Sequence, residues 1–153
     1  MKHYDETHEA EIAAALEGRT IVTAEAHDVS MPGPYGFTET YEGTLTLDDG
    51  TRLVVRGNDG GCGCSAGCYP LSHLAATPGL ITKAEVVSEP VHDGMDGDGE
   101  GRYAIYVYSE NRRINAAEFV GSDGNGYYGT GFQLIVLEPG ESTVRIGERE
   151  DTQ

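Results

Sequence analysis

The sequence has no tryptophan, only three cysteines and no long apolar run. The cysteines all lie between positions 62 and 68, too close together for a spread disulfide framework, which predicts a reducing compartment. No stretch approaches the roughly 20 apolar residues that a membrane-spanning helix needs. The first residues, MKHYDETHEAEIAAALEG, carry acids where a signal peptide carries bases. We therefore expect a soluble protein that stays in the cytoplasm where it is made, without a membrane partner.

Basic residues are also scarce, with 10 Lys and Arg against 26 Asp and Glu, a formal net charge of -16. Such an imbalance repels phosphate backbones and favours basic proteins or divalent cations as partners. Direct nucleic-acid binding is therefore not expected. Because the carboxylates are scattered over nearly the whole chain, a plain role in solubility is the other interpretation.

The length of 153 residues predicts one domain with a single core that needs no disulfides. Residues 5–17 predict a short helix, with Asp5 as N-cap, Ile12 and Leu16 on one face, and Gly18 ending it. The expected organisation is an N-terminal helix within 1–17, a β-rich core over 18–138, and an edge strand or frayed acidic tail over 139–153.

Alternating side chains predict strands through the core. In residues 41–57, Leu45 and Leu47 alternate with threonines, and Asp49-Gly50 supplies a tight turn, which predicts a hairpin. Further strands are expected at 21–29, 80–89, 102–110, 113–120 and 131–138, and a short helix at 70–76. The strands at 102–110 and 113–120, joined by a short turn at 110–112, predict a second hairpin. With no βαβ rhythm, the fold class is mainly β (α+β): a single antiparallel sheet, strongly curled or in two layers.

The loop GNDGGCGCSAGCYPLSH places Cys62, Cys64, Cys68 and His73 within twelve residues. These are zinc ligands by type, and four of them would close a structural tetrahedral site without an open position. Cys62 and Cys64 reach one ion only if the chain turns between them. The alternatives are small buried thiols beneath a glycine-rich loop, or a Cys64 to Cys68 disulfide.

The same loop contains Gly-Cys-Ser-Ala-Gly, a formal match to a nucleophile elbow around Ser65. That motif needs a strand ending directly at the serine and a helix after it, whereas loop residues surround Ser65 here. The sequence thus provides no coherent catalytic set, and an enzyme is not the favoured interpretation.

The segment HDGMDGDGEG carries Asp93, Asp96, Asp98 and Glu100, an incomplete echo of a calcium-binding EF-hand loop. The twelfth position is Val107 where a glutamate is required, so we expect a solvated loop and no specific calcium site.

The later segment SDGNGYYGTG carries two adjacent tyrosines. Tyr127 and Tyr128 are candidate recognition groups or parts of the core whose hydroxyl groups reach water.

The order of four short motifs resembles a family of small uncharacterised proteins encoded mostly by tailed phages of actinobacteria. The motifs are a Leu-Asp-Asp-Gly-Thr hairpin, a Gly-Asn-Asp-Gly-Gly-Cys loop, a Leu-Ile-Thr-x-x-Glu strand and Gly-Tyr-Tyr-Gly, and the likeness covers roughly residues 18–137. The resemblance implies a phage accessory protein acting in the host cytoplasm. It implies no activity and no functional residues.

The charge and the missing catalytic set favour a non-enzymatic interaction protein whose acidic surface binds a basic host protein. One alternative is a zinc-stabilised structural or virion-associated domain. Another is a mimic of DNA that inhibits a nucleic-acid-binding protein, which requires carboxylates in rows on one face. The sequence does not indicate an oligomeric state.

Overall fold

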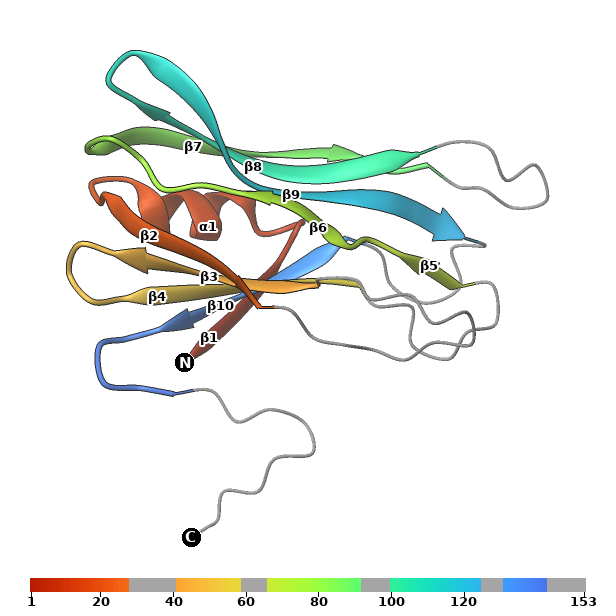
Figure 1. Ribbon diagram of the computed structural model, residues 1–153, viewed down its shortest axis with the longest axis horizontal. Helices are drawn as coiled ribbons and strands as arrows, with labels where there is room; N and C mark the ends of the chain where they lie inside the picture. The colour runs from red at the N-terminus through yellow and green to blue at the C-terminus, as the bar shows by residue number, and fades with distance from the viewer. Residues whose placement is uncertain (28–40, 59–65, 92–99, 125–130, 143–153) are drawn as a thin grey trace, which may run out of the picture.

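The computed structural model describes residues 1–27, 41–58, 66–91, 100–124 and 131–142. This part of the chain forms two antiparallel β-sheets and one helix (Figure 1). The sheets face each other as two layers (Figure 1). The mainly β fold class is as predicted, but the described residues form two separate sheets where a single sheet was predicted.

The first sheet joins both ends of the described chain. Its strands are β1 (Lys2–Asp5), β2 (Ile21–His27), β3 (Glu42–Leu47), β4 (Arg52–Gly57) and β10 (Phe132–Leu137). They lie in the order β1-β10-β4-β3-β2, all antiparallel to their neighbours. The sheet therefore ends in β1 on one side and β2 on the other.

The second sheet is built around a long hairpin. Its strands are β5 (Ala66–Cys68), β6 (Leu71–Leu74), β7 (Ile81–Glu89), β8 (Gly101–Ser109) and β9 (Arg112–Gly124). They lie in the order β5-β9-β8-β7. Both β5 and β6 pair with the same edge of β9, β5 near its end and β6 further back along it. This sheet ends in β7 on one side and in β5 and β6 on the other.

The predicted short helix at 70–76 is wrong, because β6 occupies that segment. Leu71 and Leu74 lie three positions apart, a spacing that also fits one face of a helix. In the structure, a register shift between Leu71 and His73 lets Leu71 and Leu74 both pack against the core from a strand.

The predicted N-terminal helix is confirmed but shorter than expected. Helix α1 (Glu9–Leu16) begins after His8, and the four residues of β1 precede it. Asp5 is not the N-cap: its side chain accepts hydrogen bonds from Thr7, and its carbonyl oxygen accepts one from the N–H of His8. A turn thus separates β1 from α1.

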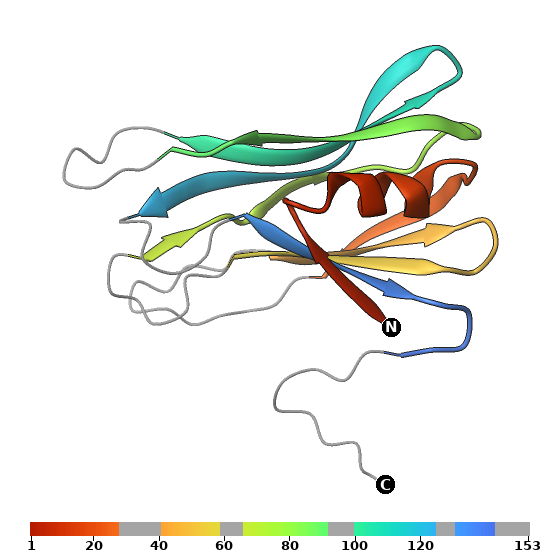
Figure 2. The ribbon, with the colours of Figure 1, turned by 180° about the vertical axis from the view of Figure 1, so that it is seen from behind.

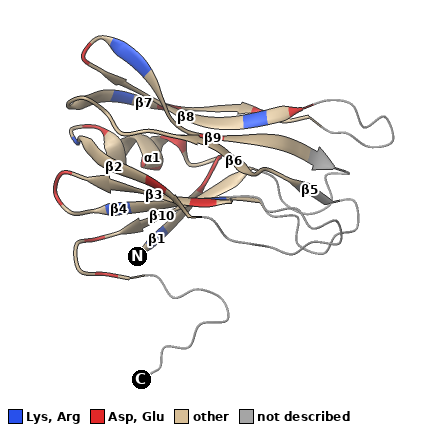
Figure 3. Ribbon diagram, in the orientation of Figure 1, with Lys and Arg blue, Asp and Glu red and all other residues tan. Residues whose placement is uncertain are grey.

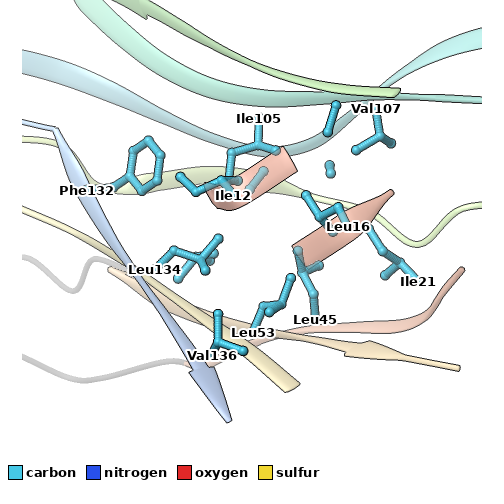
Figure 4. Close-up of a cluster of buried hydrophobic side chains, with 14 of the residues drawn as sticks. Ile12, Leu16, Ile21, Leu45, Leu53, Ile105, Val107, Phe132, Leu134 and Val136 are labelled. Carbon is cyan, nitrogen blue, oxygen red and sulfur yellow. The ribbon is translucent and has the colours of Figure 1, made fainter. Parts of the chain in front are cut away.

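Helix α1 lies along one side of the two layers, beside β7 (Figure 2). Ile12 and Leu16 are fully buried there, as predicted, and the left-handed Gly18 (φ 83°) follows the helix. The core between the sheets contains side chains from α1 and both layers (Figure 4). Its fully buried members include Leu45, Leu53, Leu134, Ile105, Val107 and Phe119.

Both predicted hairpins are confirmed. β3 and β4 pair across the Asp49-Gly50 turn, and β8 and β9 pair across Glu110 and Asn111, whose φ values are 53° and 65°. Positive φ at both central residues is the mark of a type I′ turn, which matches the twist of the flanking strands. β2, β7 and β10 also lie where alternation predicts strands.

Candidate functional site

The outer face of β7, β8 and β9 carries a connected set of polar and aromatic side chains. Tyr103, Ile105 and Val107 of β8 are buried in the core, so alternation turns Arg102 and Tyr106 outward. The register then sets outward residues of the three strands side by side. The rows are Lys83, Tyr108, Arg113; Glu85, Tyr106, Asn115; Val87, Ala104, Glu118; and Glu89, Arg102, Val120. We call this surface the Arg–Tyr face.

Tyr106 lies at the centre of the Arg–Tyr face. The guanidinium carbon of Arg113 is 3.8 Å from the centre of the Tyr106 ring, within cation–π range. Arg113 Nη2 also lies 3.0 Å from Glu85 Oε2, and the Tyr108 hydroxyl group donates to the same oxygen at 3.2 Å. The carboxylate of Glu85 on β7 therefore contacts both Tyr108 on β8 and Arg113 on β9.

Arg102 joins the other side of this network. Its Nε donates to Glu89 Oε1 at 3.0 Å, and its Nη1 donates to the Tyr106 hydroxyl oxygen at 2.8 Å and to Glu118 Oε2 at 3.2 Å. The hydrogen bond with Tyr106, aided by the charges of Glu89 and Glu118, raises the pKa of Arg102 above its ordinary value. The hydrogen bonds to Glu89, Tyr106 and Glu118 orient the guanidinium group of Arg102 on this face.

The chemistry of the Arg–Tyr face is that of recognition or of sheet stabilisation. Tyrosine and arginine are enriched among residues that dominate binding energy at protein interfaces. The three cations Lys83, Arg102 and Arg113 balance three carboxylates, so the face is locally neutral on an acidic protein. Cross-strand pairs of these types also stabilise an exposed sheet face without any partner.

A second feature lies between β2 and β6, on the side of the two layers opposite α1 (Figure 1). It is an open groove of about 400 Å³ lined by Ala24, Ala26, Leu71, Ser72, His73 and Leu74. We call it the β2–β6 groove. Its lining is small and apolar on the β2 side, and mixed on the β6 side.

The structure places two of the four predicted zinc ligands. Cys68 lies opposite Ser122 of β9, and His73 lies opposite Glu118. Four residues along a strand span roughly 13 Å, so β9 holds these two positions apart. Cys62 and Cys64 lie outside the described residues, as does half of the alternative disulfide.

Within the described residues, no group of three or more His, Cys, Asp or Glu is placed to hold a metal ion. The zinc site stays a prediction. Elemental analysis of protein purified without chelator checks it, because all four ligands together would retain about one zinc per chain.

Most of the other predicted site residues lie outside the described ranges. These are Asp93, Asp96 and Asp98 of the acidic loop, and Tyr127 and Tyr128. Glu100 is described: it is exposed immediately before β8, at the rim of an open hollow of about 440 Å³ that Arg102 also lines. We expected no specific calcium site in this loop. Because three of its four acidic residues lie outside the described ranges, that expectation stays a prediction.

Sequence reasoning did not single out the Arg–Tyr face. The alternation of Arg102, Tyr106 and Tyr108 in a predicted hairpin was a usable signal for an outward row. The register that brings Arg113 to the tyrosines depends on a shift between Ile105 and Tyr106 in the pairing of β8 with β9, which alternation does not show.

Comparison with known proteins gives the family and no function. No curated protein matches the chain. No solved structure matches it either. In the part of the chain that the structure describes, no helix has the length and apolar character needed to cross a bilayer. A family model matches residues 14–134, most of the two-sheet core, and the chain therefore belongs to the family described as a domain of unknown function, DUF7448.

Proposed function

We propose that this protein is a non-enzymatic binding protein whose acidic surface associates with a basic protein. The observation that carries the proposal is how the charges of the described residues are paired. Arg19, Arg56, Arg102 and Arg113 each lie within ion-pair distance of at least one carboxylate. Four of the six arginines among the described residues are thereby neutralised locally.

Many carboxylates have no such counterpart. Among the described residues, the glutamates outside the ion pairs are Glu9, Glu11, Glu17, Glu25, Glu100, Glu110 and Glu138. Figure 3 shows acidic positions on α1, on strands of both sheets and on turns between them. The unbalanced charge is therefore spread over the protein and is negative.

A field of this sign attracts a basic partner over distances comparable to the Debye length and speeds its association. It also makes the association sensitive to salt, because dissolved ions screen exposed charges. The finer proposal, a phage accessory protein that acts on a host protein in the host cytoplasm, is supported by the sequence motifs that resemble actinobacterial phage proteins.

The test is affinity capture from an actinobacterial lysate, with identification of captured proteins by mass spectrometry. We expect a basic protein to be recovered at about 0.1 M salt and largely lost at about 1 M, where the Debye length falls from roughly 10 Å to roughly 3 Å. A variant with Glu11→Gln, Glu110→Gln and Glu138→Gln should recover less of it. Recovery of no protein at either salt concentration contradicts the proposal.

Duplex DNA added to the same capture distinguishes a narrower form of the proposal. If the protein mimics DNA, the captured protein is one that binds DNA, and duplex DNA displaces it. If duplex DNA does not displace the captured protein, the protein is not a DNA mimic, and its basic partner recognises the acidic surface in another way.

A further inference from the structure

The edges of the two sheets differ in how their backbone groups are satisfied. An edge strand presents a row of unpaired N–H and C=O groups, which proteins usually cover or interrupt. At β7 the covering is done by α1 and by Glu17, the residue that follows it. Glu9 Oε2 accepts a hydrogen bond from the N–H of Val86 at 2.8 Å, and Glu17 Oε2 accepts one from the N–H of Ala84 at 3.2 Å. The β7 edge is thus occupied along its middle.

The register of the first sheet shows which groups β2 presents at its own edge. The N–H of Leu47 donates to the carbonyl oxygen of Thr51, so residues 43, 45 and 47 direct their backbone groups to β4. Residues 42, 44 and 46 therefore direct theirs to β2, where they meet Thr23, Glu25 and His27. Ala24 and Ala26, which alternate with these, direct their N–H and C=O groups away from the sheet.

One end of this edge is already extended by the chain itself. The N–H of Thr77 donates to the carbonyl oxygen of Ile21 at 3.0 Å, and the N–H of Ile21 donates to Thr77 Oγ1 at 3.0 Å. Backbone from another segment can therefore approach β2 from this side and pair with it. Beyond Ile21, no described residue makes a corresponding pair with Ala24 or Ala26.

The β2–β6 groove lies directly beyond these two alanines. Their small side chains line it on one side, and Leu71 and Leu74 line it on the other. A strand added to β2 would direct alternate side chains into the groove and the others toward solvent. Apolar side chains suit the positions that face the two leucines.

Charge decides between a second copy and a different partner. Glu25 lies between Ala24 and Ala26, is exposed, and belongs to no ion pair among the described residues. Pairing β2 with its own copy would bring Glu25 residues together, and each chain carries a net charge of -16. A segment with basic side chains beside Glu25 has no such penalty.

We propose that the open edge of β2 at Ala24 and Ala26 binds an extended segment of a partner protein, with alternating basic and apolar side chains, as an added strand. This inference rests on the proposed function for the existence of a basic partner. It adds the site and the conformation in which that partner binds.

The probe is a fluorescein-labelled peptide, Lys-Val-Lys-Val-Lys-Val-Lys, with binding followed by fluorescence anisotropy. Ala26→Pro removes an N–H that points off the sheet and leaves the pairing with β3 in place. We expect this variant to bind at least about tenfold more weakly, which is about 1.4 kcal/mol. Ala26→Val keeps the N–H and is the matched control, expected to bind as the wild type does.

A control peptide with N-methylated valines carries the same charge but cannot donate those backbone hydrogen bonds, so it should not bind. Hydrogen exchange in the wild type provides a measurement that needs no variant. With saturating peptide, exchange at the amides of Ala24 and Ala26 should slow at least about tenfold, while exchange at Glu25, which already pairs with β3, stays unchanged.

No binding by the wild type, equal binding by Ala26→Pro, or unchanged exchange at both alanines overturns strand addition. The proposed function fails in a different way, when lysate capture recovers no salt-sensitive basic protein with either form. Capture of one basic protein by both the wild type and Ala26→Pro leaves the proposed function standing and removes the β2 edge as its site.

Discussion

The guanidinium carbon of Arg113 lies 3.8 Å from the centre of the Tyr106 ring, and the two residues belong to neighbouring strands of one sheet. Arg113 is held there by Glu85 of the third strand. Three strands are therefore linked on the outside of the sheet by one stacked cation, which makes the Arg–Tyr face a stabilising element whether or not it also binds a partner.

A double-mutant cycle measures this link. We expect Arg113→Ala and Tyr106→Ala to be coupled by about 0.5–1 kcal/mol in the free energy of unfolding, the range for an exposed cation–π pair. Chemical denaturation of the wild type, both single variants and the double variant gives the coupling. Arg112→Ala paired with Tyr106→Ala is the control and should show additivity, because Arg112 makes no contact with the ring among those the structure describes. Additive behaviour in the Arg113 cycle would show that the stacking contributes nothing.

The backbone at Cys68 and Tyr69, between β5 and β6, lies so close to Gly57 of β4 and Gly121 of β9 that both positions require glycine. A Cβ atom at Gly57 would overlap the carbonyl oxygen of Tyr69, and one at Gly121 would overlap that of Cys68. Both obstacles are backbone atoms, which cannot turn aside as a side chain can. We expect Gly57→Ala to lower the free energy of unfolding by about 2–3 kcal/mol.

Gly79→Ala is the matched control for that prediction. Its added Cβ would meet only the carboxylate end of Glu110, a flexible side chain that can move. We expect a change within about 0.5 kcal/mol, measured by the same denaturation experiment. If Gly57→Ala and Gly79→Ala lower the free energy of unfolding equally, then the backbone of Tyr69 does not lie as close to Gly57 as described.

The parts of the fold that sequence predicted are those fixed by local chemistry. The turns at Asp49-Gly50 and Glu110-Asn111 specify their hairpins within a few residues, and alternation around them marks the inward face. β1 and β5 are three or four residues long and pair with strands far away in the sequence. No local pattern of that length distinguishes a strand from a loop.

The candidate site was less predictable because it depends on register. The open edge of β2 follows from which residues of β3 face β4, and the Arg–Tyr face depends on a one-residue shift near Ala116. A shift of one position reverses every outward side chain beyond it. A register shift also occurs in β6, between Leu71 and His73, and it places Leu71 and Leu74 on one face of the strand. That spacing also fits a helix, so the sequence did not distinguish the two structures.

The hydrogen bonds from the edge of β7 to Glu9 and Glu17 can be tested by replacing each glutamate separately. We expect Glu9→Ala and Glu17→Ala to lower the free energy of unfolding by about 1 kcal/mol each, the usual value of such a hydrogen bond. Hydrogen exchange at the amides of Val86 and Ala84, respectively, should become faster. Glu11→Ala is the control, because Glu11 is exposed on the same helix and contacts neither amide. Unchanged exchange in the Glu9 and Glu17 variants would mean that solvent, not α1, satisfies that edge.

The turn between β1 and α1 predicts a specific loss of stability in acid. Asp5 Oδ1 accepts hydrogen bonds from the hydroxyl group of Thr7 at 2.6 Å and from its N–H at 2.9 Å. The hydroxyl group, above all, lowers the pKa of Asp5 below its ordinary value of about 4. Because the pKa is lower in the folded than in the unfolded chain, the contribution to stability is complete above about pH 4 and disappears as the pH falls through the folded value.

Thr7→Val removes the hydroxyl donor and keeps the shape of the side chain. We expect the pKa of Asp5 to rise toward its ordinary value, which a carboxyl-carbon NMR titration measures directly. The variant should also lose less stability than the wild type between about pH 5 and pH 2, because less of its stability depends on an ionised Asp5. Thr23→Val, on an exposed position of β2 away from Asp5, should leave the titration unchanged. If Asp5 titrates identically in the wild type and Thr7→Val, then the backbone N–H of Thr7, and not its hydroxyl group, stabilises the carboxylate.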